Sequence, residues 1–82
     1  MELKDTIDGM LSDCYKERFI AEYQQAKIRW QKLNTMLIKY MDGELDFTPK
    51  SNILTLVNQA TIMQSYIITL EIRAEQEGIK LT

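Results

Sequence analysis

Hydrophobic residues recur at helical spacing in three stretches of the chain. In the first stretch, Leu3, Ile7, Met10 and Leu11 fall on one side of a helix, with polar residues between them. This pattern predicts a short amphipathic helix over residues 2–11.

The second stretch follows Ser12 and Asp13, either of which is a suitable N-cap. Its apolar residues are spaced alternately four and three apart, which is the heptad spacing of a helix packed along one seam. These residues are Phe19, Tyr23, Ala26, Trp30, Leu33, Leu37 and Tyr40. Because Gly43 suits a helix C-terminus, we expect this helix to span residues 13–42.

The third stretch repeats the heptad spacing. Thr48 and Pro49 are a favourable N-cap and first helical residue, and Gly78 with Ile79 suits a Schellman-type cap. The apolar seam consists of Ile53, Leu56, Ala60, Met63, Ile67, Leu70 and Ala74. The pattern predicts a helix over residues 49–77.

Two long helices of similar length joined by a short connection predict an antiparallel αα-hairpin. The expected fold is therefore all-α, a single helical-hairpin domain over residues 1–82 with a short N-terminal helix. The third stretch also carries apolar residues beside and opposite its seam, and a lone hairpin cannot cover them. They are Leu54, Val57, Ile62, Tyr66, Ile68 and Ile72. We expect a homo-oligomeric helical bundle with an interface formed by Ile62, Tyr66, Ile68 and Ile72.

Composition excludes several classes of function. The chain has 82 residues, no histidine and one cysteine, so it lacks imidazole for acid–base catalysis and cannot form an internal disulfide. No grouping of residues suggests a catalytic or metal site. We therefore expect a protein that is not an enzyme and that uses no cofactor.

The N-terminus is acidic and no apolar signal segment follows it, which predicts a cytoplasmic protein. The stretch Ser51–Leu70 has no charged residue, but Ser, Asn, Gln and Thr are frequent in it, which argues against a membrane span.

Charge is unevenly distributed. The formal net charge is −2, yet six of the ten basic residues lie in the second predicted helix. Basic residues beside a heptad seam are often solvent-exposed residues that flank the seam and pair with charges across an interface. Alternatively, their neighbourhood with Tyr15 and Tyr23 suits a phosphate-binding rim on which a nucleobase stacks. Both interpretations fit the sequence, and the acidic overall charge disfavours DNA or RNA as a partner.

Four motifs give the chain a family resemblance. They are Tyr15-Lys16-Glu17-Arg18-Phe19, Ala21-Glu22-Tyr23, Gly43-x-Leu45-x-Phe47-Thr48-Pro49 and Leu70-Glu71-x-Arg73-Ala74-x-x-Glu77-Gly78-Ile79-x-Leu81. In these motifs the chain resembles short phage and prophage helical-hairpin proteins of Gram-positive bacteria. Its layout is similar to the hairpin domain of the anti-CBASS and anti-Thoeris sponge proteins, which sequester cyclic nucleotide immune signals without altering them.

The resemblance implies a phage-encoded anti-defence protein that binds a cyclic oligonucleotide or a cyclic ADP-ribose type signal. It implies an aromatic residue that stacks on a base, for which Tyr15 fits, and a lysine that meets phosphate. Lys27 fits the second role, although Lys16 and Lys32 remain open. The remaining implied ligand-binding residues are Arg18, Tyr23 and Arg73. An alternative hypothesis is a small inhibitor or adaptor that binds a host defence protein through the hairpin surface.

Overall fold

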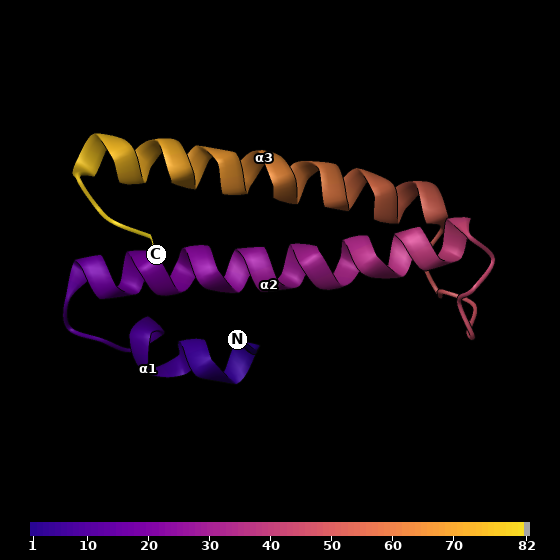
Figure 1. Cartoon of the computed structure of the whole chain (residues 1–82), viewed down its shortest axis with the longest axis horizontal. Helices are drawn as coiled ribbons and strands as arrows, with labels where there is room; N and C mark the ends of the chain where they lie inside the picture. The colour runs from indigo at the N-terminus through magenta and orange to yellow at the C-terminus, as the bar shows by residue number, and fades with distance from the viewer. Residues whose placement is uncertain (82) are drawn as a thin grey trace.

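In the computed structural model, which describes residues 1–81, every regular element is helical. A 3-10 helix, η1 (Leu3–Thr6), continues into one turn of α-helix, α1 (Ile7–Met10), and two long helices follow, α2 (Tyr15–Met41) and α3 (Ile53–Glu77). Figure 1 shows α2 in the middle, with α3 antiparallel to it on one side. The N-terminal segment, formed by η1 and α1, lies on the other side along the first half of α2. The prediction of an all-α fold is confirmed.

The core lies at the end of the hairpin where α2 begins and α3 ends. It contains Phe19, Tyr23, Ile67, Leu70 and Ala74. Leu70 is completely buried, and Ile79 packs against the same cluster from the C-terminal tail. The tail reaches it because Gly78 has a left-handed φ of 68°, and the Ile79 N–H donates to the Ala74 carbonyl at 2.8 Å. The predicted cap is confirmed.

Both long helices begin later than the sequence suggests. α3 begins at Ile53 instead of Pro49, because the Asn52 side chain accepts a hydrogen bond from the Leu54 N–H at 2.8 Å and caps the helix there. Pro49 remains in the connecting loop. The prediction that α3 starts at Pro49 was wrong.

The N-terminal segment packs on α2 through small residues and not through its apolar side. Thr6 is buried, with its hydroxyl donating to the Leu3 carbonyl at 2.7 Å, and a Cβ added at Gly9 would lie 2.8 Å from Ala21 Cβ. The expected apolar stripe instead faces solvent at Ile7, Met10 and Leu11. The small side chains allow a closer approach of the two backbones than Ile or Met would permit.

The outward face of α3 has no cover among residues 1–81. Leu54, Ile62, Ile68 and Ile72 are all exposed, whereas the seven predicted seam residues of this helix are buried or half-buried. By length and composition alone, α3 is apolar enough to cross a membrane, and only 17% of its most apolar window is buried inside the chain. A helix at the centre of an oligomer has the same composition.

Replacing Leu70 by alanine tests the position of the core. We expect Leu70→Ala to lower the free energy of unfolding by about 2–5 kcal/mol, because it leaves a cavity at a fully buried site. The matched control is Leu11→Ala, at a side chain that is 77% exposed, with an expected change within about 0.5 kcal/mol. Urea unfolding followed by circular dichroism measures both, and equal losses would contradict the assigned core.

Candidate ligand-binding site

Three side chains meet at the end of the hairpin formed by the start of α2 and the end of α3. The Tyr15 hydroxyl donates to Glu77 Oε1 at 2.6 Å, and Arg73 Nη2 donates to the same hydroxyl at 3.1 Å. Arg73 Nε also lies 3.4 Å from Glu77 Oε2. The hairpin therefore brings together residues that are about sixty positions apart in sequence. Two of them, Tyr15 and Arg73, are predicted ligand-binding residues.

An aromatic surface supports the guanidinium of this cluster. The Arg73 Cζ lies 4.9 Å from the centre of the Phe19 ring, and the Tyr15 and Phe19 rings are 6.2 Å apart at an angle of 55°. Phe19 is buried, while Tyr15 is 49% exposed. The cluster thus presents the half-exposed Tyr15 ring and the half-exposed Arg73 guanidinium to solvent. The guanidinium lies over the ring of Phe19, which is buried in the core. We call Tyr15, Phe19, Arg73 and Glu77 the hairpin-end cluster.

Tyr23 and Lys27 form a second contact two turns further along α2. Lys27 Nζ lies 5.5 Å from the centre of the Tyr23 ring, and the Tyr23 hydroxyl donates to Glu71 Oε2 at 2.7 Å. Tyr23 is buried and Lys27 exposed, so the ring holds the ammonium group at the edge of the seam. Lys16 is exposed on the same flank of α2, as its helical position predicts.

Arg18 lies apart from this arrangement. At 100° per residue it falls on the opposite flank of α2 from Lys16 and Lys27. Its Nη1 donates to the Ser12 carbonyl at 2.8 Å, which ties the guanidinium to the link before α2. The structure therefore groups Tyr15 with Arg73, and Tyr23 with Lys27, but joins Arg18 to neither pair.

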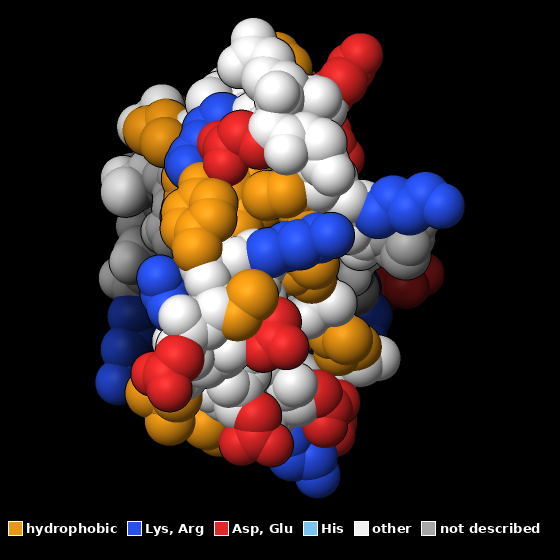
Figure 2. Space-filling model, turned by 90° about the vertical axis from the view of Figure 1, so that its left-hand side faces the viewer, with side chains coloured by type: hydrophobic (Ala, Val, Ile, Leu, Met, Phe, Trp, Pro, Cys, Tyr) orange, Lys and Arg blue, Asp and Glu red, His pale blue; other side chains and the backbone are white. Residues whose placement is uncertain are grey.

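Figure 2 looks onto this end of the hairpin, where hydrophobic side chains are surrounded by both basic and acidic ones. The acids affect the titration of the tyrosines. The hydrogen bond to Glu77 is the main cause that raises the pKa of Tyr15 above its ordinary value. Burial is the main cause that raises the pKa of Tyr23, and its bond to Glu71 adds to the rise. Both hydroxyls therefore stay protonated at neutral pH and act as hydrogen-bond donors.

Sequence reasoning did not identify Glu77 as a member of the cluster. Its spacing of four from Arg73 is the usual spacing of a helical ion pair, and this signal could have been used. For metal binding the geometry offers nothing in residues 1–81, because no three Cys, Asp or Glu side chains gather there.

Comparison with protein families finds a match over most of the chain. The family model described as Sequestin matches residues 13–76, which include α2, the connecting loop and nearly all of α3. Comparison with curated proteins and with solved structures finds no match. The matched range contains Tyr15, Phe19 and Arg73 of the hairpin-end cluster.

The role of Glu77 can be tested by the titration of Tyr15. We expect Glu77→Gln to lower the pKa of Tyr15, because the acceptor of its proton loses its charge. In the native protein, the folded state holds this proton more tightly than the unfolded chain does. The resulting stability is complete below the ordinary tyrosine pKa of about 10, and it is lost as the pH rises through the raised value.

NMR titration of the labelled tyrosine ring carbons measures this pKa in each variant. Glu75→Gln, two positions away and without a contact to Tyr15, is the control and should leave the titration unchanged. An unchanged pKa in Glu77→Gln would show that the hydrogen bond is not formed in solution.

Proposed function

The chain belongs to the Sequestin family, and from this premise we propose that it sequesters a cyclic nucleotide immune signal without cleaving it. The family name denotes sequestration, which agrees with the resemblance to sponge proteins. The ligand class that we propose is a cyclic oligonucleotide or a cyclic ADP-ribose type molecule. The protein would act as a phage anti-defence factor in the cytoplasm of an infected bacterial cell.

The observation that carries this proposal is the hairpin-end cluster. A nucleotide offers a planar base and an anionic phosphate, and it needs a stacking surface beside a cation. Tyr15 is half-exposed and lies against Phe19, while Arg73 stands over the Phe19 ring with part of its guanidinium in solvent. The two chemistries are therefore adjacent on one surface.

Further cations flank the cluster. Lys16 and Lys27 are exposed on the same side of α2, and neither forms an ion pair with a carboxylate among residues 1–81. An anion at the cluster would gain from both ammonium groups without breaking an ion pair of either lysine, whereas Arg73 is already paired with Glu77.

The proposal of binding without cleavage rests on the chemistry of these side chains. The chain contains no histidine. The tyrosine hydroxyls of the site hold their protons above the ordinary pKa, which makes them poor bases and poor nucleophiles at neutral pH. Hydrogen bonding and stacking remain as the interactions available to a ligand.

We also propose that the protein is a homo-oligomer joined through the outward face of α3. Ile62, Ile68 and Ile72 on this face are between 49% and 60% exposed in the single chain. Tyr66, the fourth expected interface residue, is 43% exposed and donates its hydroxyl to Glu22 of α2, so it borders the α2–α3 seam. A second copy is the simplest cover for an uncharged face of this length.

Ligand binding is tested by isothermal titration with cyclic di-AMP, a cyclic trinucleotide and cyclic ADP-ribose. We expect one of them to bind, and Tyr15→Ala to weaken it by about 5- to 150-fold, since a stacked base contributes about 1–3 kcal/mol. Lys27→Ala should weaken it as well, by loss of a phosphate contact. Tyr40→Ala and Lys50→Ala, at exposed positions far along the hairpin, are the matched controls.

The same mixtures show whether the ligand is altered. Chromatography after prolonged incubation should return it intact. Absence of binding by all three probes would refute the proposed function, and recovery of cleaved ligand would refute sequestration without cleavage.

The oligomer is tested by light scattering on a size-exclusion column. We expect a mass that is a multiple of the 9.6 kDa chain, and a lower mass for Ile68→Lys, which places a charge in the apolar interface. Ile7→Lys is the matched control, because Ile7 is 53% exposed and Ile68 is 49% exposed, but Ile7 belongs to α1 and Ile68 to α3, which lie on opposite sides of α2. A wild-type mass of one chain would contradict the proposed assembly.

A further inference from the structure

The side of α2 that the N-terminal segment covers continues beyond that cover. Ala21 and Ile28 are buried on this side. Lys32, Thr35 and Lys39 follow Ile28 at positions four, seven and eleven residues later, which keeps them on the same side of the helix. Figure 1 shows that the N-terminal segment ends near the middle of α2, so this second half is left open.

The loop between α2 and α3 closes the far end of the open region. Together they border an open groove with a volume of about 370 Å³, which is within the range of small-molecule sites. It is lined by Lys32, Thr35, Met36, Lys39, Glu44, Leu45, Asp46 and Phe47. We call it the loop groove.

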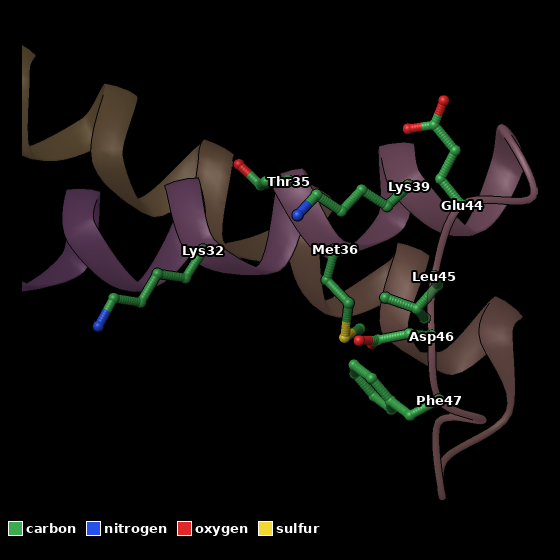
Figure 3. A pocket seen from close by; sticks show the side chains of 8 residues that line it. All are labelled: Lys32, Thr35, Met36, Lys39, Glu44, Leu45, Asp46 and Phe47. Atoms are coloured by element: carbon green, nitrogen blue, oxygen red, sulfur yellow. The ribbon is translucent and has the colours of Figure 1, made fainter.

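Three residues, Met36, Leu45 and Phe47, form an apolar wall of the groove. In Figure 3 the Phe47 ring lies below the end of the Met36 side chain, with Leu45 beside them. Phe47 is 55% exposed although it is a large aromatic residue, so the chain itself leaves much of this ring uncovered. Aromatic rings and thioethers are favourable contacts for a planar ligand.

The polar groups of the groove have mixed charge. Lys32 and Lys39 are separated by seven residues, about 10 Å along the helix, and neither forms an ion pair with a carboxylate in the described part of the chain. In Figure 3 the Glu44 carboxylate points away from Phe47, whereas Asp46 extends toward Met36. The groove is therefore lined by two lysines that form no ion pair, by two acidic residues, of which Asp46 extends toward Met36, and by one apolar wall.

We propose that the loop groove is a second nucleotide-binding site of this chain. The base lies against Phe47 and Met36, and phosphate groups contact the ammonium groups of Lys32 and Lys39. Asp46 accepts a hydrogen bond from an amino group of the base or a hydroxyl group of the ribose. The choice of a nucleotide follows from this combination, because a simple anion would contact neither the apolar wall nor a hydrogen-bond acceptor, whereas a base contacts both.

This inference rests on the proposed function for its ligand class, but it concerns a different place. Lys32 is seventeen residues from Tyr15 along α2, which is about 25 Å. A single small ligand cannot touch the groove and the hairpin-end cluster of the same chain. The proposal therefore predicts two nucleotide sites per chain.

The test is a titration of the isotope-labelled full chain, followed by amide NMR spectra, with AMP, cyclic di-AMP and cyclic ADP-ribose. Inorganic phosphate is titrated separately. We expect a nucleotide to shift the amides of residues 32–47, in addition to those of residues 15–23 and 71–77. Lys39→Ala and Phe47→Ala should each weaken the nucleotide affinity reported by the amides of residues 32–47 by about five-fold or more. The amides of residues 15–23 and 71–77 should still shift in both variants.

Tyr15→Ala should weaken the shifts of residues 15–23 and 71–77 and leave those of residues 32–47 unchanged. Lys50→Ala, an exposed lysine of the same loop that does not line the groove, is the matched control and should change neither response. The spectrum of each variant without ligand shows whether it is folded.

The outcomes separate the two proposals. Shifts confined to residues 15–23 and 71–77, or groove shifts unaffected by Lys39→Ala and Phe47→Ala, would overturn the second site and leave the proposed function intact. Equal groove shifts with inorganic phosphate would overturn it too, because the base would then play no part. No shift with any nucleotide would overturn both proposals.

Discussion

The packing of the last turns of α3 against the first turns of α2 is the contact on which the rest of the molecule depends. Leu70 is fully buried there in one cluster with Phe19 and Tyr23 of α2, and Ala74 lets the two helices approach closely. Because this contact sets the register of the hairpin, it also decides which surface residues become neighbours. Tyr15 meets Arg73 and Glu77 only in this register. The candidate site is thus a direct product of the core beneath it.

The two long helices differ in how much of their surface the rest of the chain covers. α2 is covered on two sides in its first half, by α3 and by the N-terminal segment, whereas its second half is covered by α3 and bordered at its far end by the connecting loop. α3 is covered on one side alone, and its outward face is apolar. The uncovered surfaces differ in chemistry, because that of α3 has no charge over its first five turns, whereas that of α2 carries lysines. This difference favours a protein partner for the first and an anionic small molecule for the second.

Sequence patterns predicted the parts of the fold that depend on hydrophobic spacing. The seam of α3 and its cap at Gly78 agree with expectation, since heptad spacing and a left-handed glycine are strong local signals. The packing side of the N-terminal segment does not follow from its apolar spacing, because that spacing takes no account of the close approach that Gly9 permits. Likewise, Thr48 and Pro49 are a good helix start on their own, but the side chain of Asn52 caps the helix later.

The candidate site was predictable only in part from the sequence. Tyr15 was indicated by its residue type and its place among cations, Arg73 only by the family resemblance, and Glu77 not at all. Their contact depends on the hairpin register, which spacing alone does not supply. Arg18 has the same charge as Arg73 and a place near Tyr15 in sequence, but the helix turns it to the other flank. The loop groove escaped notice because its wall comes from the connecting loop, whose path no periodic pattern describes.

The contacts of Arg73 have a consequence for how tightly this surface can hold a ligand. The guanidinium is already held within the chain by Tyr15, by Glu77 and by the face of Phe19. A long flexible side chain normally loses rotamer freedom when it binds, at a cost of about 0.5–1.5 kcal/mol. Here that rotamer entropy is lost when the chain folds. Packing of the core therefore offsets its free-energy cost, and the cost does not reduce the affinity for a ligand. Folding thus prepares a rigid surface on a small protein, which is the form that tight capture of a scarce molecule requires.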